Sequence, residues 1–83
     1  MKDPTGDARA LIEHVARALV DQPNEVSVHE VEEPQEIVLE LEVSPDEVGK
    51  VIGRQGRTAR ALRNLLSAAT LGSEKSYELE ILE

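Results

Sequence analysis

Hydrophobic positions recur with two different periods along this chain. Between residues 8 and 20, apolar side chains recur three, four and one positions apart, which predicts a helix with one buried face. Between residues 37 and 43, apolar positions alternate with mostly polar ones, which predicts a half-buried strand. Val26, Val28 and Val31 predict a shorter strand, and their imperfect alternation suggests a bulge. Because residues 32–35 form only a short turn, we expect the two strands to pair antiparallel.

A helix start follows the second strand. Ser44 is placed to cap it, Pro45 suits the first helical position, and Glu47 would complete a capping box. The short helix ends at Gly53, and a second helix begins at Arg57. The second helix has a predicted buried stripe of Leu62, Leu65, Leu66 and Ala69. Alternation then predicts a third strand, with Tyr77, Leu79 and Ile81 on one face and Glu78 and Glu80 on the other.

The predicted element order is α-β-β-α-α-β. Two helices separate the last two strands, which permits a parallel pairing through a right-handed crossover. We therefore expect an α+β fold with a three-stranded mixed sheet and three helices packed on one face. At 83 residues the chain should form one domain, structured over about residues 8–82, with residues 1–6 flexible. Asp7, or its close rival Thr5, is the expected cap of the first helix.

Composition excludes several classes of function. The chain has no Cys, no apolar run of about 20 residues and no signal-peptide pattern, so we expect a cytoplasmic protein. His14 and His29 lie on different elements without further ligands at metal spacing, and Ser44 has no histidine near it in sequence. The glutamates of the predicted strands are more simply explained as the wet face of a sheet. We expect no catalytic activity, no metal and no cofactor.

Charge is distributed unevenly along the chain, and residues 48–73 stand out from the rest. This window contains five basic residues and no acid, whereas the rest of the chain carries all 17 acidic residues and a net charge of −13. At its centre lies Gly53-Arg54-Gln55-Gly56, between two apolar helical segments. Two glycines let a nucleic-acid strand approach the backbone, and the start of the next helix points amide groups and positive dipole toward the loop. The window therefore indicates a site for a polyanion backbone, most simply single-stranded RNA.

Two simpler explanations remain open at this point. The four residues could be only a tight turn between helices, and the basic residues could be a solvated helix face. A nucleotide P-loop is excluded because no Lys-Ser/Thr pair follows the last glycine. The near absence of aromatic residues argues against modules that bind RNA by base stacking.

The segment Val51-Ile52-Gly53-Arg54-Gln55-Gly56 resembles the VIGxxG signature of the KH domain, whose GxxG loop clamps four nucleotides. The element order resembles the type II, prokaryotic variant. From about residue 8 to residue 82 the chain is similar to the small single-KH bacterial RNA-binding proteins of the KhpA family. That resemblance implies an RNA chaperone that works with a larger KH-containing protein in cell elongation and cell-wall synthesis.

The functional positions of the KH motif, carried over residue by residue, give a candidate site together with the charge pattern. The expected RNA-binding residues are Lys50, Gly53, Arg54, Gln55, Gly56, Arg57 and Arg60, and the expected groove residues are Val51, Ile52 and Ala59. Many KH domains carry a large aliphatic residue at the position of Ala59, so the groove should be shallow.

The expected partners are single-stranded RNA and either a second copy of the chain or a larger KH protein. Val38 and Leu82 are expected on the outward side of the sheet, where they could contact such a partner. An alternative function is a protein-interaction subunit whose fold mainly docks that partner. The sequence does not distinguish RNA from single-stranded DNA.

Overall fold

The computed structural model describes residues 8–83, so the expectations for residues 1–6 and for a cap at Asp7 or Thr5 lie outside the described residues. The principal elements are α1 (Ala8–Leu19), β1 (Ser27–Glu32), β2 (Glu36–Glu42), α2 (Val48–Ile52), α3 (Arg57–Ala69) and β3 (Ser76–Ile81). Three short 3-10 turns connect them, η2 (Pro23–Glu25), η3 (Pro45–Glu47) and η4 (Arg54–Gly56). No helix within residues 8–83 is long and apolar enough to cross a membrane.

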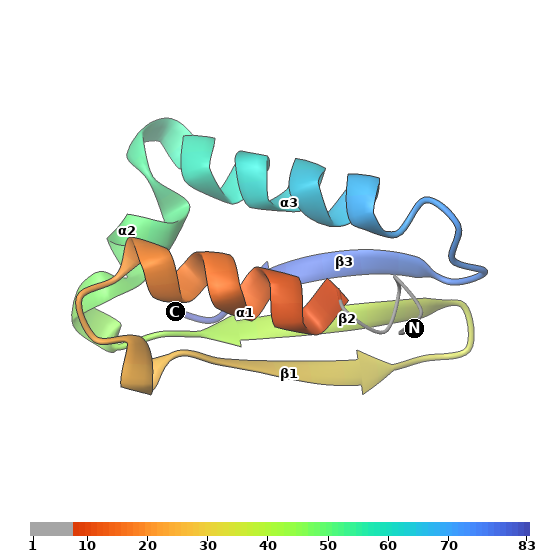
Figure 1. Cartoon of the computed structure of the whole chain (residues 1–83), viewed down its shortest axis with the longest axis horizontal. Helices are drawn as coiled ribbons and strands as arrows, with labels where there is room; N and C mark the ends of the chain where they lie inside the picture. The colour runs from red at the N-terminus through yellow and green to blue at the C-terminus, as the bar shows by residue number, and fades with distance from the viewer. Residues whose placement is uncertain (1–7) are drawn as a thin grey trace.

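The three strands form one mixed sheet in the order β1-β2-β3. β1 pairs with β2 in antiparallel orientation, and β2 pairs with β3 in parallel orientation. α1, α2 and α3 all lie on the same side of this sheet (Figure 1). The α+β architecture predicted from the sequence, including the crossover between β2 and β3, is confirmed.

The core lies between the helices and the inner face of the sheet. Its largest fully buried side chains come from every layer: Ile12 of α1, Leu39 and Leu41 of β2, Val51 of α2 and Leu66 of α3. Because side chains alternate along a strand, the opposite face of β2 and β3 carries the acidic residues Glu36, Glu40, Glu42, Glu78 and Glu80. The sheet therefore separates an apolar interior from an acidic outer surface.

Two details of the hydrophobic pattern differ from expectation. β1 and β2 pair in a continuous register from Ser27 with Glu42 to Glu32 with Ile37, so β1 has no bulge. Val26 and Val28 are buried, whereas Val31 lies on the other face of the strand and is 38% exposed. Leu65 was expected in the buried stripe of α3 but is 36% exposed. α3 buries Ala59, Leu62 and Leu66, of which Leu62 and Leu66 join the core, and Leu65 lies outside that stripe.

The predicted capping box at Ser44 is wrong. Pro45–Glu47 forms a 3-10 turn without a side-chain cap, and α2 begins only at Val48. The Ser44 hydroxyl instead accepts a long hydrogen bond of 3.4 Å from Gln22 Nε2. Glu47 is buried, and its carboxylate accepts hydrogen bonds from the backbone N–H groups of Asp21 and Gln22 at 2.6 and 2.9 Å. A long-range contact therefore replaces the local one.

Candidate nucleic-acid interface

The turn between α2 and α3 has left-handed backbone at three of its four residues. Gly53 has φ 77° and ψ 170°, Gln55 has φ 58° and ψ 24°, and Gly56 has φ 74° and ψ 16°. The turn is closed by a hydrogen bond of 3.1 Å from Gly56 N to Gly53 O. Glycine adopts these dihedrals without steric cost, whereas Gln55 is held in an uncommon conformation. The backbone conformation of this loop is therefore specified closely.

Gly53 is also required by its surroundings. A Cβ atom at this position would lie 2.3 Å from Thr58 Oγ1 and 2.8 Å from the backbone nitrogen of Thr58. A Cβ atom at Gly56 would meet nothing within 4 Å. The first glycine thus lets the loop pack directly on the start of α3, and the second serves only the turn.

The N-terminus of α3 faces this loop without a side-chain cap. Its N-cap is Gly56, and within residues 8–83 it has no side-chain cap, although the Arg57 N–H already donates to the carbonyl oxygen of Arg54. The first amides of a helix have no partner within the helix, and they carry the positive end of its dipole. A long hydrogen bond of 3.4 Å from Arg57 Nη2 to Gln55 Oε1 braces the exposed side of the turn. The arrangement is suited to an anionic group held close to the main chain.

Four arginines lie at this helix start and along the first two turns of α3: Arg54, Arg57, Arg60 and Arg63. Among residues 8–83, none of the four has a carboxylate partner within ion-pair distance. The other described cations are all paired. Arg9 and Arg17 both contact Glu13, and Lys75 contacts Glu32. The positive charge that is left uncompensated in this part of the chain is therefore concentrated beside the loop.

Lys50 differs from these arginines. Its Nζ atom lies 2.6 Å from Asp21 Oδ2 and 3.0 Å from Glu47 Oε2. These contacts raise the pKa of Lys50, with the hydrogen bond to Asp21 as the largest cause. The pKa of Glu47 is lowered, chiefly by the hydrogen bond from the Asp21 backbone and further by the Lys50 ammonium. Lys50 lies in α2, before the loop, and its ammonium group is held by two carboxylates on Asp21 and Glu47.

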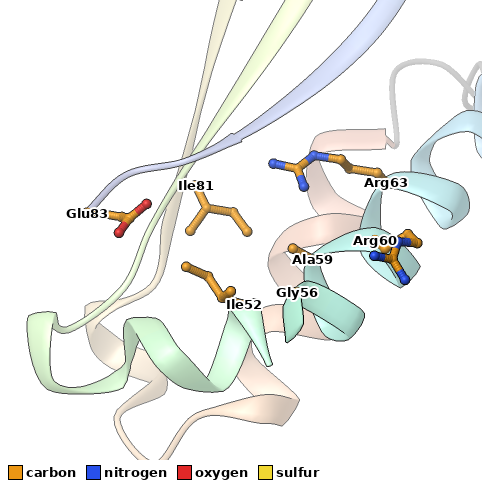
Figure 2. Close-up of a pocket in the computed structure, with 7 residues that line it drawn as sticks. All are labelled: Ile52, Gly56, Ala59, Arg60, Arg63, Ile81 and Glu83. Carbon is orange, nitrogen blue, oxygen red and sulfur yellow. The ribbon is translucent and has the colours of Figure 1, made fainter. Parts of the chain in front are cut away.

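An apolar groove of about 460 Å³ opens next to the loop. Ile52 of α2 and Ile81 of β3 face each other across it, and Ala59 of α3 lies at its side (Figure 2). Arg63 extends from α3 toward β3 at one end (Figure 2). The complete lining is Ile52, Gly56, Ala59, Arg60, Arg63, Ile81 and Glu83.

The structure brings together nearly all of the residues expected at the site. Ile52 and Ala59 line the groove, whereas Val51 is 0% exposed and packs in the core cluster instead. Ile81 of β3, Glu83 beyond the end of that strand, and Arg63 of α3 also line the groove but were missed. Sequence alternation placed Ile81 on the inner face of β3, but it did not show that this end of β3 packs beside Ile52 and Gly56. Arg63 has a helical spacing of three from Arg60 and could have been included.

A three-stranded mixed sheet covered on one face by three helices, with a GxxG turn between the last two helices, defines a type II KH domain. The family model for the KH domain of KhpA/KhpB matches residues 9–81. The chain therefore belongs to the KhpA/KhpB KH-domain family.

Relatives from distant bacteria match over most of their length. The chain is 45% identical over 75 residues to the RNA-binding protein KhpA of Halalkalibacterium halodurans, covering 90% of this chain and 99% of that protein. It is 51% identical over 73 residues to KhpA of Treponema pallidum, covering 88% and 91%. It is 49% identical over 73 residues to KhpA of Aquifex aeolicus, covering 88% and 92%. The comparison with solved structures gave no match.

Proposed function

We propose that this chain is a cytoplasmic RNA-binding protein that clamps single-stranded RNA at the GxxG loop. The observation that carries the proposal is the group of four arginines without carboxylate partners among residues 8–83, which lie at and along the first two turns of α3, a helix whose start has no side-chain cap within those residues. A phosphate at this start would accept hydrogen bonds from backbone amides and from Arg54 or Arg57. The naming of the relatives as RNA-binding proteins supports the same function.

The proposed contacts divide between backbone and bases. Gly53 and Gly56 allow the strand to approach, Gln55 donates to phosphate or sugar, and Arg60 extends the basic surface along α3. Unstacked bases would enter the apolar groove between Ile52 and Ile81. Lys50 belongs to the proposed site, but we expect it to contribute less than the arginines because two carboxylates already bind its ammonium group.

The family resemblance extends the proposal to RNA chaperone activity in cell elongation and cell-wall homeostasis, together with a larger KH-containing protein. A loop that holds about four nucleotides offers few contacts, so two linked KH domains would gain affinity by avidity. Leu65 and Leu71 are 36% and 85% exposed, and Val38 and Leu82 are partly exposed. Single exposed apolar side chains are common on protein surfaces, so the partner proposal, a second copy or another KH protein, rests mainly on the gain from avidity.

Sedimentation tests the partner proposal directly. We expect the purified chain to sediment as a dimer at tens of micromolar, or to bind a KH protein in a pull-down. A strict monomer that captures no KH protein would contradict it.

A salt titration tests the proposed RNA contact. If three or four phosphates are engaged, log K for single-stranded RNA should fall against log salt with a slope of about −2 to −3, at ~0.7 per phosphate. Binding should occur despite the net charge of −8, because screening limits the reach of the distant acids to about 8–10 Å. Affinity that does not change between low and physiological salt would contradict a phosphate clamp and favour the protein-docking alternative.

A further inference from the structure

We propose that the RNA-binding surface continues past the groove into a second base-binding subsite between α3 and β3, where Tyr77 supplies an aromatic surface. The proposal rests on the RNA-binding function proposed above. It adds a nucleotide beyond those held by the loop and the groove. The occupant is an unstacked base of the same RNA strand.

The subsite is a hollow of about 210 Å³ on the α3–β3 side of the molecule. This volume is below the roughly 300 Å³ of the smallest typical ligand pockets, so it suits a single base better than a larger ligand. Its lining is Arg63, Leu66, Ser67, Tyr77, Glu78 and Leu79.

Arg63 joins this hollow to the groove because it lines both. Its Nε donates a long hydrogen bond of 3.4 Å to the carbonyl oxygen of Leu79, which ties the guanidinium group to β3 between the two hollows. Among residues 8–83, no carboxylate lies within ion-pair distance of Arg63. A strand that leaves the groove along α3 therefore passes a cation before it reaches Tyr77.

The chemistry of the lining favours a base over a phosphate. Tyr77 is the only aromatic residue of the chain, and it is partly exposed while it packs against the core. Base–aromatic stacking tolerates any sequence because every base has a π face. Arg63 and the Ser67 hydroxyl supply donors for the base or the sugar.

The test compares RNA oligonucleotides of four and eight nucleotides with randomised sequence. They are titrated against the parent chain and the Tyr77→Leu and Tyr77→Phe variants, and all three proteins are melted. Lengthening the RNA should raise the affinity of the parent about fivefold more than that of Tyr77→Leu, a value at the low end of stacking energies. Tyr77→Phe keeps the aromatic ring, so its affinity should rise with RNA length as much as that of the parent. The number of possible binding registers is the same for all three proteins, so it cancels in this comparison.

The tyrosine ring gives a second readout that needs no variant. Because the chain contains one Tyr and no Phe or Trp, its Tyr ring resonances report on this residue alone. They should shift with the eight-nucleotide RNA and stay nearly unchanged with the four-nucleotide RNA.

The possible failures can be distinguished. The second subsite would be overturned, and the loop clamp left intact, by either of two results. One is that lengthening the RNA raises the affinity of Tyr77→Leu as much as that of the parent. The other is that the Tyr ring resonances do not shift with the eight-nucleotide RNA. A parent that binds neither length would contradict the proposed function itself, and the subsite with it.

Discussion

At residue 53 two requirements for glycine coincide. The dihedrals of Gly53 fall in a region that other residues rarely occupy, and a Cβ atom would collide with both the side chain and the backbone of Thr58. At Gly56 only the dihedral requirement applies. The two glycines of the motif are therefore unequal, although the sequence pattern treats them alike.

This inequality predicts different costs for the same substitution. Gly56→Ala should cost about 1 kcal/mol through the left-handed φ alone. Gly53→Ala should cost roughly 2–3 kcal/mol, because the Thr58 backbone cannot move away without displacing the start of α3. For a domain of this size, 1 kcal/mol lowers the melting temperature by about 4–8 °C. Thermal melting of the two variants gives the comparison, and equal losses would show that the contact with Thr58 does not constrain the loop.

At the scale of elements, Glu47 connects two segments that are distant in the sequence. Its buried carboxylate binds backbone amides in the segment after α1, and it also binds the ammonium group of Lys50 in the neighbouring α2. The Lys50 side chain reaches Asp21 as well. α2 leads directly into the GxxG turn, so this link fixes the loop relative to α1 and the sheet.

The link predicts a specific pH dependence. Because folding lowers the pKa of Glu47 from its ordinary value of 4.5, ionised Glu47 stabilises the fold above that value. This contribution should be lost as the pH falls through the lower pKa of the folded state. Glu47→Gln removes the charge and should lower the melting temperature by on the order of 5–10 °C near pH 7.

Melting curves from pH 7 to pH 3 measure this effect as the difference between parent and variant. The difference should be constant near neutral pH and shrink as the pH falls below 4.5. Glu80→Gln, on the exposed outer face of the sheet, is the matched control, and its free energy of unfolding should lie within about 0.5 kcal/mol of that of the parent. A Glu47→Gln variant that melts like this control would contradict the link.

The same elements show which features the sequence could predict. The strands and helices follow from local periodicity, and the GxxG turn follows from two glycines next to a helix start. The role of Glu47 could not be predicted, because its hydrogen-bond partners lie 25 and 26 residues away and a local capping box fitted the same letters. The groove was only half predicted for a similar reason, since Ile81 and Glu83 lie more than 20 residues beyond the loop in the sequence and meet Ile52 and Gly56 only in the folded structure.

At the scale of the whole molecule, charge is separated by the layers of the fold. The outer face of the sheet carries glutamates of β2 and β3, whereas the arginines lie around the turn from α2 to α3 on the helical side. Figure 1 shows α2 and that turn at one end of the molecule, with the C-terminus at the same end. Long-range electrostatics should therefore admit RNA from one direction and repel it from the sheet. A net charge of −8 is compatible with RNA binding for this reason.

The central claim is that the GxxG loop holds the RNA backbone, and RNA affinity of the Arg54→Asp/Gln55→Asp double variant tests it most directly. Both side chains are exposed, and Asp tolerates the left-handed conformation of residue 55, so each change should alter stability by no more than about 0.5 kcal/mol. Two negative charges would face the phosphate, each costing on the order of 1 kcal/mol even in water, in addition to the lost contacts of Arg54 and Gln55.

Affinity and thermal melting should be measured on the same preparations, with Arg9→Ala and Arg17→Ala as controls on α1. Both control arginines are paired with Glu13, so their loss should leave RNA affinity nearly unchanged. The account predicts that the double variant melts like the parent and no longer binds RNA. A double variant that melts like the parent and binds RNA equally well would contradict it.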